Sequence, residues 1–378
     1  MSDTYARLFD RNIQAFFGEA LRISLHDPRM ALFVARALHH QRRAARVRRD
    51  CEAAGVHVPA FMIVSVTHRC NLACKGCYAR AQHPRGEAEM PPDKLRSVIA
   101  EAEALGVSIV MIAGGEPLTR REVLGIAAEH PGIVFPLFTN GILIDDAVLD
   151  HLRRHRNIVP VLSIEGHQSE TDLRRGEGVH AHVLETMRRL REAGVFFGTS
   201  LTVTRQNHDL VTGRPFVERM LETGCRLFFF VDYVPVQPGT ECLALTQEQR
   251  DEEARRLAAY REDLPGLFVA FPGDEEMYGG CLAAGRGFVH VSPSGRLEPC
   301  PFSPYSDVSL EDVTLREALR SRFLETIRLS DEHLGETQGG CALWDRRDWV
   351  QSLLHTTNPG ATAYAAAHAA ESTDLAAQ

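Results

Sequence analysis

The sequence predicts an α/β fold built around a sheet of parallel strands. Between about residues 60 and 240, short β-branched or aromatic runs alternate with stretches of helical periodicity. Strands alternating with helices in this way indicate βαβ units, whose strands run parallel. Right-handed crossovers make either an open sheet or a partial barrel, and periodicity alone does not choose between them.

Length and composition are those of a globular protein with two to three domains. The chain has 378 residues, of which 44% are hydrophobic and 24% charged, which excludes a disordered, collagen-like or coiled-coil protein. The formal net charge of -8 argues against a nucleic-acid-binding protein, because such proteins are usually basic. No signal peptide and no apolar run long enough for a transmembrane segment is present. We therefore expect a cytoplasmic protein.

The first 57 residues are predicted to form helices. Phe9, Ile13 and Phe16 follow three- and four-residue steps, the spacing of one helix face. Asp27 and Pro28 then mark the start of a second helix, as its N-cap and first turn.

Six strands and the helices between them are expected next. The strands are predicted at 61–67, 108–113, 133–138, 159–164, 195–203 and 227–234. The helical patterns cover 92–105, 120–129, 144–154, 181–193 and 212–223.

The alternation stops after residue 240, which predicts a small C-terminal domain. Residues 246–260 are expected to form a helix with Thr246 as its N-cap. A hairpin is expected around Ser294 and Gly295. The predicted organisation is a helical segment (1–57), a central domain (58–240), a C-terminal domain (241–355) and a loose tail (356–378).

Cys70, Cys74 and Cys77 follow the first predicted strand. Residues after a strand lie at its carboxyl end, where α/β folds bind ligands. Three thiolates are one fewer than the four that close a structural zinc site or a cubane. A [4Fe–4S] cluster here leaves one iron open for a small ligand; the alternative is a zinc site with another ligand such as His68.

Further motifs follow the next strands. They are Gly114-Gly115-Glu116-Pro117, Thr139-Asn140-Gly141, Ser163-Ile164-Glu165-Gly166 and, shortly after, Arg175-Gly176. Glycines let the backbone come close to a ligand, and a glutamate can accept hydrogen bonds from an amino group. Each motif taken alone also fits an ordinary turn.

Taken together, these residues resemble the radical S-adenosylmethionine (radical SAM) superfamily. The resemblance covers about residues 60–240 and rests on Cx3CxxC followed by Tyr78 and on the Gly-Gly-Glu-Pro motif. It implies a partial (β/α)6 TIM barrel with a SAM-binding [4Fe–4S] cluster on Cys70, Cys74 and Cys77. It also implies a set of SAM contacts: Gly114, Gly115, Glu116 and Pro117 at the methionine amino group, Asn140, Ser163 and Glu165 at strand ends, and Arg175 at the methionine carboxylate.

The implied chemistry starts with an electron from the cluster. It cleaves S-adenosylmethionine, and the 5′-deoxyadenosyl radical abstracts a hydrogen atom from a substrate C–H bond; the protein orients the cofactors and excludes water. We expect a radical SAM enzyme of oxidoreductase type, served by an electron donor such as flavodoxin or ferredoxin.

A second cysteine set comprises Cys281, Cys300 and Cys341. The spacing C-x13-G-x4-C from Cys281 to Cys300 resembles the opening of the SPASM and twitch extensions, which carry auxiliary iron–sulfur clusters. Only Cys341 follows, so the resemblance supports at most one auxiliary [4Fe–4S] cluster in an α+β, twitch-like domain. The candidates for the fourth ligand of this cluster are Cys242, Asp345, His333 and the substrate. The alternative is three buried structural cysteines.

Asp232 and Tyr233 interrupt an apolar run at the end of the sixth predicted strand, and Cys242 follows it. We predict substrate contacts for Asp232 and Tyr233 and consider Cys242 as a hydrogen-atom or proton donor. Ordinary loop polarity is the alternative.

The substrate is predicted to be a small molecule that is oxidised or epimerised. The alternative is a ribosomally made peptide that is crosslinked or oxidised. The small molecule is preferred because residues 1–57 lack the strands of a leader-binding winged-helix module. A non-catalytic, zinc-bound scaffold is a remote alternative that leaves the strand-end motifs unexplained.

Overall fold

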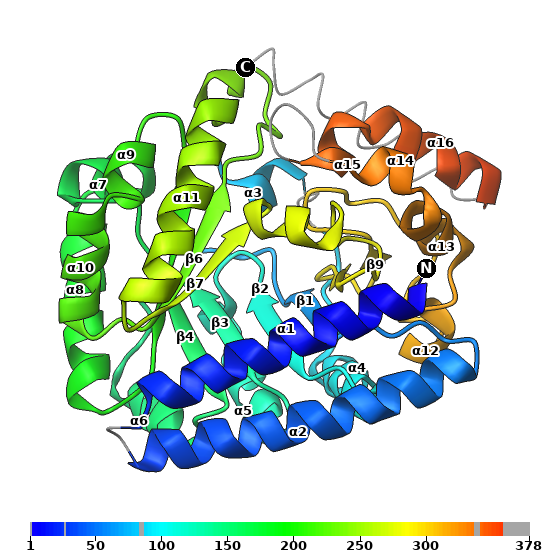
Figure 1. Cartoon of the computed structure of the whole chain (residues 1–378), viewed down its shortest axis with the longest axis horizontal. Coiled ribbons are helices and arrows are strands. Elements are labelled where there is room, and N and C mark those ends of the chain that lie inside the picture. Colours follow the sequence, from blue (N-terminus) through cyan, green and yellow to red (C-terminus); the bar gives the residue numbers. More distant parts are fainter. Residues whose placement is uncertain (1, 26–27, 83–86, 336–340, 358–378) are drawn as a thin grey trace.

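The computed structural model describes residues 2–25, 28–82, 87–335 and 341–357 of the chain (Figure 1). Nearly all of the predicted tail, 356–378, lies outside these residues.

A single sheet of nine strands, in the order β7-β6-β5-β4-β3-β2-β1-β8-β9, forms the centre of the molecule. The strands are β1 (Phe61–Ser65), β2 (Ile109–Ala113), β3 (Phe135–Thr139), β4 (Ile158–Ser163), β5 (Gly198–Val203), β6 (Leu227–Asp232), β7 (Leu267–Phe271), β8 (Phe288–Val291) and β9 (Leu297–Glu298). All neighbours from β7 to β8 pair parallel, and β9 pairs antiparallel to β8. The six predicted strands are confirmed, and the curled sheet is the expected partial TIM barrel.

The sheet is wider than the sequence predicted. β7 extends it beyond β6, with Leu227 opposite Leu267. The predicted hairpin is present as β8 and β9, but β8 also pairs with β1, and Phe61 lies opposite Phe288. The cysteine-rich C-terminal segment is therefore joined directly to the strand that leads to Cys70.

Helices connect the strands as expected. They are α3 (Tyr78–Gln82), α4 (Pro92–Leu105), α5 (Glu122–Ala128), α6 (Asp146–Arg154), α7 (Gln168–Arg175), α8 (Val179–Glu192), α9 (His208–Val211), α10 (Arg214–Thr223) and α11 (Gln247–Asp263). The predicted N-cap of α11 is confirmed: Thr246 Oγ1 accepts the amide hydrogen of Gln249 at 3.2 Å, and the Gln249 side chain accepts the amide hydrogen of Thr246 at 3.2 Å. This reciprocal pair fixes the helix start.

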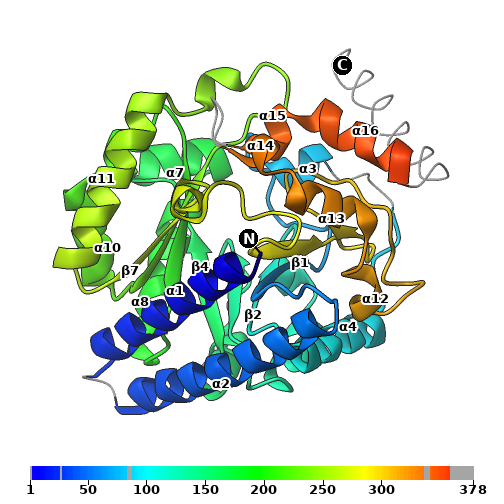
Figure 2. The ribbon, with the colours of Figure 1, turned by 45° about the vertical axis from the view of Figure 1, so that its right-hand side comes forward.

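The C-terminal helices are short and gather on one side of the sheet, next to α3 (Figure 2). They are α12 (Leu315–Ala318), α13 (Arg322–Leu329), α14 (Asp331–Leu334), α15 (Ala342–Asp345) and α16 (Arg347–Thr357). The described part of the chain also contains three 3-10 turns: η1 (Pro117–Thr119), η2 (Glu241–Leu243) and η3 (Gly273–Tyr278).

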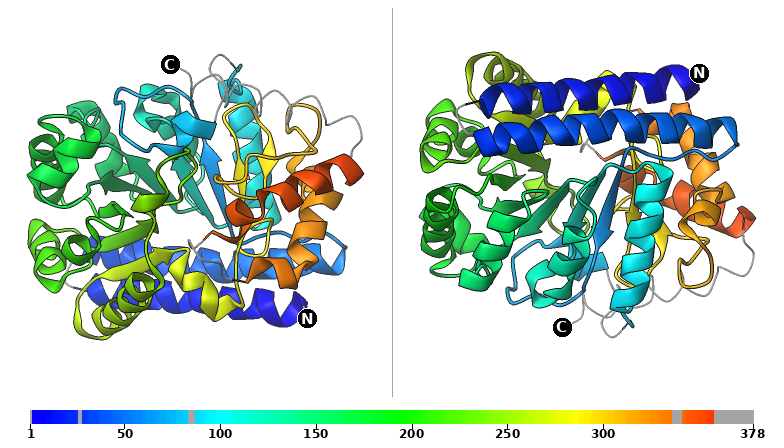
Figure 3. Two further views of the ribbon diagram at one scale, coloured as in Figure 1. Left: turned by 90° about the horizontal axis from the view of Figure 1, so that it is seen from above. Right: turned by 90° about the horizontal axis from the view of Figure 1, so that it is seen from below.

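Two long helices, α1 (Ser2–Ile23) and α2 (Pro28–Ala53), confirm the predicted helical segment. They lie side by side across the lower face of the molecule (Figure 3). The buried Arg48 of α2 pairs with Asp10 of α1 and donates a hydrogen bond to the Gly106 carbonyl at the end of α4. This contact ties both helices to the barrel.

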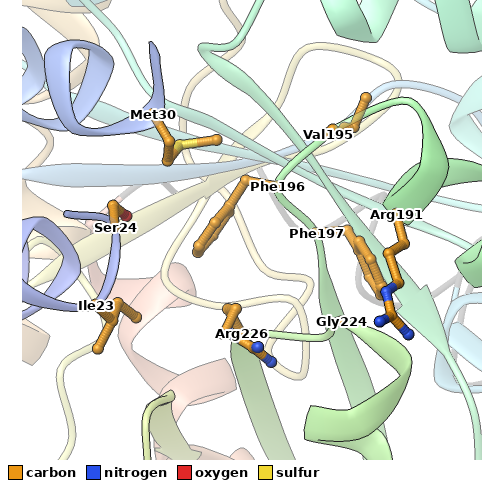
Figure 4. Close-up of a pocket in the computed structure, with 10 residues that line it drawn as sticks. Ile23, Ser24, Met30, Arg191, Val195, Phe196, Phe197, Gly224 and Arg226 are labelled. Atoms are coloured by element: carbon orange, nitrogen blue, oxygen red, sulfur yellow. The ribbon is translucent and has the colours of Figure 1, made fainter. Parts of the chain in front are cut away.

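A cavity of about 220 Å³ lies where the helical segment meets the residues that precede β5 and β6 (Figure 4). Ile23 and Met30 line it from the helical segment, and Phe196 and Arg226 line it just before β5 and β6. It therefore lies at the amino ends of the strands, opposite the end where barrels of this kind carry out chemistry. Among the described residues, every helix is too short or too polar to cross a membrane.

Candidate active site

The loop carrying Cys70, Cys74 and Cys77 leaves the carboxyl end of β1 and leads into α3. Cys70 is exposed and the other two are half-buried. Partial shielding from water raises the pKa of the Cys70 thiol, and the charges of Glu116, Cys74 and Cys77 add to the shift. These four groups therefore lie close enough to interact.

Gly114 and Gly115 let the end of β2 approach this loop. The amide of Gly115 donates to the Thr67 carbonyl at 2.7 Å, and that of Glu116 donates to the Arg69 carbonyl at 2.8 Å. Gly114 has φ +133°, and a Cβ there would stand 2.6 Å from the Thr67 oxygen; one on Gly115 would clash with the Arg69 oxygen. The two glycines therefore admit the cysteine loop, and their predicted contact with a ligand stays a prediction.

Glu116 is 1% exposed and uses both carboxylate oxygens within the protein. One oxygen accepts from Leu118 N at 3.0 Å and from Thr139 Oγ1 at 2.8 Å, and the other accepts from Asn140 N at 2.8 Å. Burial raises the pKa of Glu116. The hydrogen bonds lower it, but they do not outweigh the effect of burial. This carboxylate joins the ends of β2 and β3, and its contact with a methionine amino group stays a prediction.

Asn140 connects the third strand end to the same loop, since its Nδ2 donates to Asn71 Oδ1 at 2.8 Å. Pro117 is buried at the start of η1, and Ser163 is half-buried at the end of β4. Four strand ends thus converge on the region above the cysteines.

Glu165 and Arg175 form a buried ion pair beside the cysteines. Arg175 Nε donates to Glu165 Oε1 at 2.8 Å, and Arg175 Nη1 lies 4.0 Å from Cys74 Sγ. Burial alone lowers the pKa of Arg175, but Glu165, Cys74 and Cys77 outweigh it and raise the net value. Arg174 Nη1 donates to the same Glu165 oxygen, Oε1, at 2.5 Å and to Thr202 Oγ1 at 2.9 Å. A fixed positive charge therefore stands next to the thiols.

Asp232 and Tyr233 lie on opposite faces of the sheet, because successive side chains of a strand alternate. Tyr233 packs on the cysteine loop: a Cβ on Gly76 would stand 2.8 Å from its hydroxyl oxygen. That hydroxyl is buried and has no hydrogen-bond partner among the described residues. Tyr233 therefore lies against the cysteine loop, and its contact with the substrate stays a prediction.

Asp232 faces the helices instead. It lines a cavity of about 170 Å³ with Glu253 of α11 and with Asp274. Glu253 is 4% exposed, and neither of its carboxylate oxygens has a hydrogen-bond partner within the described ranges. Burial, followed by the charges of Asp232 and Asp274, raises the pKa of Glu253 well above its ordinary value. The substrate contact predicted for Asp232 stays a prediction; in the structure its side chain lines the cavity beside α11.

Cys281, Cys300 and Cys341 are all buried. Burial raises the pKa of each thiol, for Cys341 to about 12, and the other thiols of the set add to the shifts of Cys281 and Cys300. The grouping of the three around one cluster stays a prediction. Cys242 is exposed in η2.

Sequence reasoning missed the buried carboxylates of Glu253 and Glu275. Each is an acid in a helical segment whose burial depends on distant parts of the chain, and no motif marks it. The aromatic Tyr78 was used only as a family marker, although its ring packs against Phe302, two residues after Cys300.

Both cysteine sets offer the ligand type that iron–sulfur clusters take, namely three thiols. Within the described ranges, no three Cys, His, Asp or Glu side chains are close enough to share one metal ion. A cubane does not require that, because each of its cysteines binds a separate iron. The residues present therefore fit a cluster at each place.

Comparisons with known proteins identify the domain. Residues 64–210 match the radical SAM superfamily. The AdoMet-dependent heme synthase of Methanosarcina barkeri is 27% identical over 290 residues, 69% of this chain and 82% of that protein. The PqqA peptide cyclase of Gluconobacter oxydans is 28% identical over 321 residues, 80% of this chain and 89% of that protein.

The fold is also found among solved structures. Streptococcus suis SuiB bound to precursor peptide SuiA is 17% identical, with a TM-score of 0.62 over 77% of this chain and 71% of that one. The expected radical SAM resemblance is confirmed over residues 64–210, and this resemblance implies a [4Fe–4S] cluster and S-adenosylmethionine as cofactors.

Proposed function

We propose that this radical SAM enzyme abstracts a hydrogen atom from a C–H bond of a peptide. The observation that carries the proposal is the group of relatives named PqqA peptide cyclase, from several bacteria. The fold likeness to SuiB, whose structure holds a precursor peptide, supports it. These comparisons favour the peptide over the small molecule that the sequence analysis preferred. The helical character of residues 1–57 concerns how a leader peptide would be recognised. It does not decide whether the substrate is a peptide or a small molecule.

Cys70, Cys74 and Cys77 are proposed to hold the SAM-binding cluster. When bound, the cluster supplies an electron that cleaves S-adenosylmethionine and so provides the radical that removes the substrate hydrogen. Arg175 holds a positive charge 4.0 Å from Cys74 Sγ. Glu116 and Asn140 fix the strand ends around the loop, and Tyr233 covers it at Gly76. This arrangement orients the cofactor and excludes water.

Cys281, Cys300 and Cys341 are proposed to hold an auxiliary [4Fe–4S] cluster. Removing a hydrogen atom leaves a radical on the peptide, and net oxidation needs an acceptor for its electron. A cluster held by these three cysteines would supply that acceptor, which is the reason for proposing the oxidoreductase type. Reducing equivalents would come from a flavodoxin or a ferredoxin.

Iron and sulfide content tests the two clusters. We expect about eight irons per chain after anaerobic reconstitution, falling to about four in the Cys70/Cys74/Cys77→Ala triple variant. About four falling to none would remove the auxiliary cluster from the proposal. Zinc in place of iron would contradict the cluster assignments altogether.

The substrate is tested with short peptides encoded beside the gene. Each is incubated anaerobically with enzyme, reductant and S-adenosylmethionine, and both 5′-deoxyadenosine and peptide mass are followed. We expect one peptide to stimulate 5′-deoxyadenosine release and to lose hydrogen, with neither change in the triple variant. Release without any change in peptide mass would contradict the proposal.

A small molecule is the second candidate, because two relatives from Methanosarcina barkeri are named AdoMet-dependent heme synthase and Fe-coproporphyrin III synthase. Stimulation of 5′-deoxyadenosine release by an iron porphyrin and by no peptide would favour it.

A further inference from the structure

We propose that the cavity shown in Figure 4 binds a small organic anion, with its carboxylate between Arg191 and Arg226 and its apolar body against Phe196. The inference goes beyond the proposed function and does not depend on it. The cavity lies at the amino ends of the strands, whereas the loop with the first cysteine set leaves the carboxyl end of β1. The proposed site is therefore separate from the candidate active site.

Arg226 is half-buried directly before β6, and backbone carbonyls hold its guanidinium in place. Its Nη1 donates to the carbonyl of Leu221 at 2.7 Å and to that of Cys225 at 2.8 Å. Both acceptors are neutral, and within the described ranges no carboxylate pairs with Arg226. The positive charge of Arg226 is therefore oriented by the protein without being neutralised.

Arg191 brings a second positive charge to the same cavity from the last turn of α8. Its Nη1 donates to the Glu222 carbonyl at 2.9 Å, which is again a neutral acceptor. Its stem packs beside Gly224, since a Cβ there would stand 3.1 Å from Arg191 Cδ. No carboxylate in the part of the chain that the structure describes pairs with Arg191. Two guanidiniums thus line one cavity, and backbone carbonyls orient both.

The two guanidiniums lie close enough to act on each other. Burial lowers the pKa of Arg226; Cys225 opposes this effect and the charge of Arg191 adds to it. Burial raises the pKa of the Cys225 thiol to about 12, so this thiol is neutral near neutral pH and supplies no counter-charge. By contrast, the buried Arg48 has a carboxylate partner in Asp10. An anion in the cavity would provide for Arg191 and Arg226 what Asp10 provides for Arg48.

The rest of the cavity wall is largely apolar. Figure 4 shows the Phe196 ring between Met30 on one side and the two arginines on the other. Phe196 is half-buried, whereas its neighbours Val195 and Phe197 are buried, so its side chain keeps free surface. Ile23 and Met30 are buried and line the cavity from the helical segment. An apolar group beside Phe196 would remove this surface from water, which is favourable.

The volume of the cavity limits the size of the ligand. It is about 220 Å³, and an apolar cavity of about 150 Å³ is already large enough for benzene. Sites for drug-sized ligands are larger, at roughly 300–1,000 Å³. Guanidinium groups match the planar carboxylate with paired donors. A small aromatic carboxylate therefore fits both the volume and the charge. Because it would contact the helical segment and the barrel together, it would bind only the folded chain and stabilise it.

Phenylacetate is the probe, because it combines one ring with one carboxylate. Its binding to the reconstituted full chain is measured by titration calorimetry, beside acetate, which lacks the ring, and 2-phenylethanol, which lacks the charge. We expect phenylacetate to bind about tenfold more tightly than either, or better. Arg191→Gln and Arg226→Gln should each weaken it by about tenfold. The matched control is Arg188→Gln on the same helix, because Arg188 is exposed and pairs with Glu185 and Glu192. This control should bind phenylacetate as wild type does.

Three results would overturn the inference. Equal affinity for phenylacetate and 2-phenylethanol, or no binding of either, would refute an anion site in wild type. Affinity that is unchanged in both Arg191→Gln and Arg226→Gln would place the ligand elsewhere. An equal loss in Arg188→Gln would reveal only a general effect of surface charge. Arg191 is exposed, so Arg191→Gln keeps the test valid even if Arg226→Gln fails to fold, which circular dichroism detects. The Cys70/Cys74/Cys77→Ala variant should bind phenylacetate as wild type does, so failure of the proposed function leaves this inference standing.

Discussion

The rings of Tyr78 and Phe302 lie 4.9 Å apart, centroid to centroid, between the two cysteine sets. Tyr78 directly follows Cys77, and Phe302 stands two residues after Cys300. Gln82 of the same helix donates to the Phe302 carbonyl at 3.1 Å. Burial raises the pKa of the Tyr78 phenol, and the charges of Cys77 and Cys300 add to the shift. One aromatic pair therefore joins the two proposed cluster sites.

Removing the Phe302 ring should loosen this junction. Phe302→Ala should lower the free energy of unfolding by about 2 kcal/mol, because the ring is only partly buried and large-to-small changes at fully buried aromatic sites cost more. It should also speed the bleaching of the auxiliary cluster in air. Denaturation and visible absorbance measure the two effects. Phe302→Leu is the conservative control; equal bleaching rates for Ala and wild type would refute the shielding role.

Gly115→Ala should damage the first cluster site specifically. A Cβ at Gly115 meets the carbonyl oxygen of Arg69, a backbone atom that cannot turn away. We expect the iron content to fall from about eight toward about four per chain, with loss of 5′-deoxyadenosine formation. Gly125→Ala is the matched control, because a Cβ at that helical glycine has nothing within 4 Å. Full iron content in Gly115→Ala would show that the loop tolerates displacement.

Local signals in the sequence predicted the strands correctly, whereas contacts between distant segments left no signal to read. The six strands and Cys70 were found because strand composition and cysteine spacing are local. The pairing of β8 with β1 depends on a sheet edge that no local pattern records. Asp232 and Tyr233 were treated as one polar pair, although the two-residue period of a strand already separates them. Glu253 had no motif at all, since the cavity that it lines is formed by residues of β6, β7, α11 and η3.

Glu253 should make the stability of the protein fall with rising pH. Its pKa is raised well above the ordinary 4.5, first by burial and then by Asp232 and Asp274, with Arg256 opposing. The folded state therefore holds a proton that the unfolded chain has already released. Stability from this group is complete below about pH 4.5 and is lost as the pH rises through the folded-state pKa.

The variant Glu253→Gln removes this titration. Its free energy of unfolding relative to wild type should increase from about pH 4.5 upward. Urea denaturation across the pH range measures the difference. Glu252→Gln, on the same helix but outside the cavity, is the control. A constant difference between Glu253→Gln and wild type at every pH would contradict the raised pKa.

Tyr233 and Asp232 should respond differently to equally small changes. Tyr233→Phe keeps the ring that packs at Gly76 and removes a buried hydroxyl with no partner among the described residues, so the fold should persist. If that hydroxyl contacts the substrate or the cofactor, formation of the modified peptide should slow by about tenfold or more. Asp232→Asn should leave turnover close to wild type, because Asp232 faces the α11 cavity. Rates of 5′-deoxyadenosine and peptide product, measured together, distinguish slower chemistry from uncoupled SAM cleavage. Full turnover in Tyr233→Phe, or a loss confined to Asp232→Asn, would reverse the assignment of the two faces of β6.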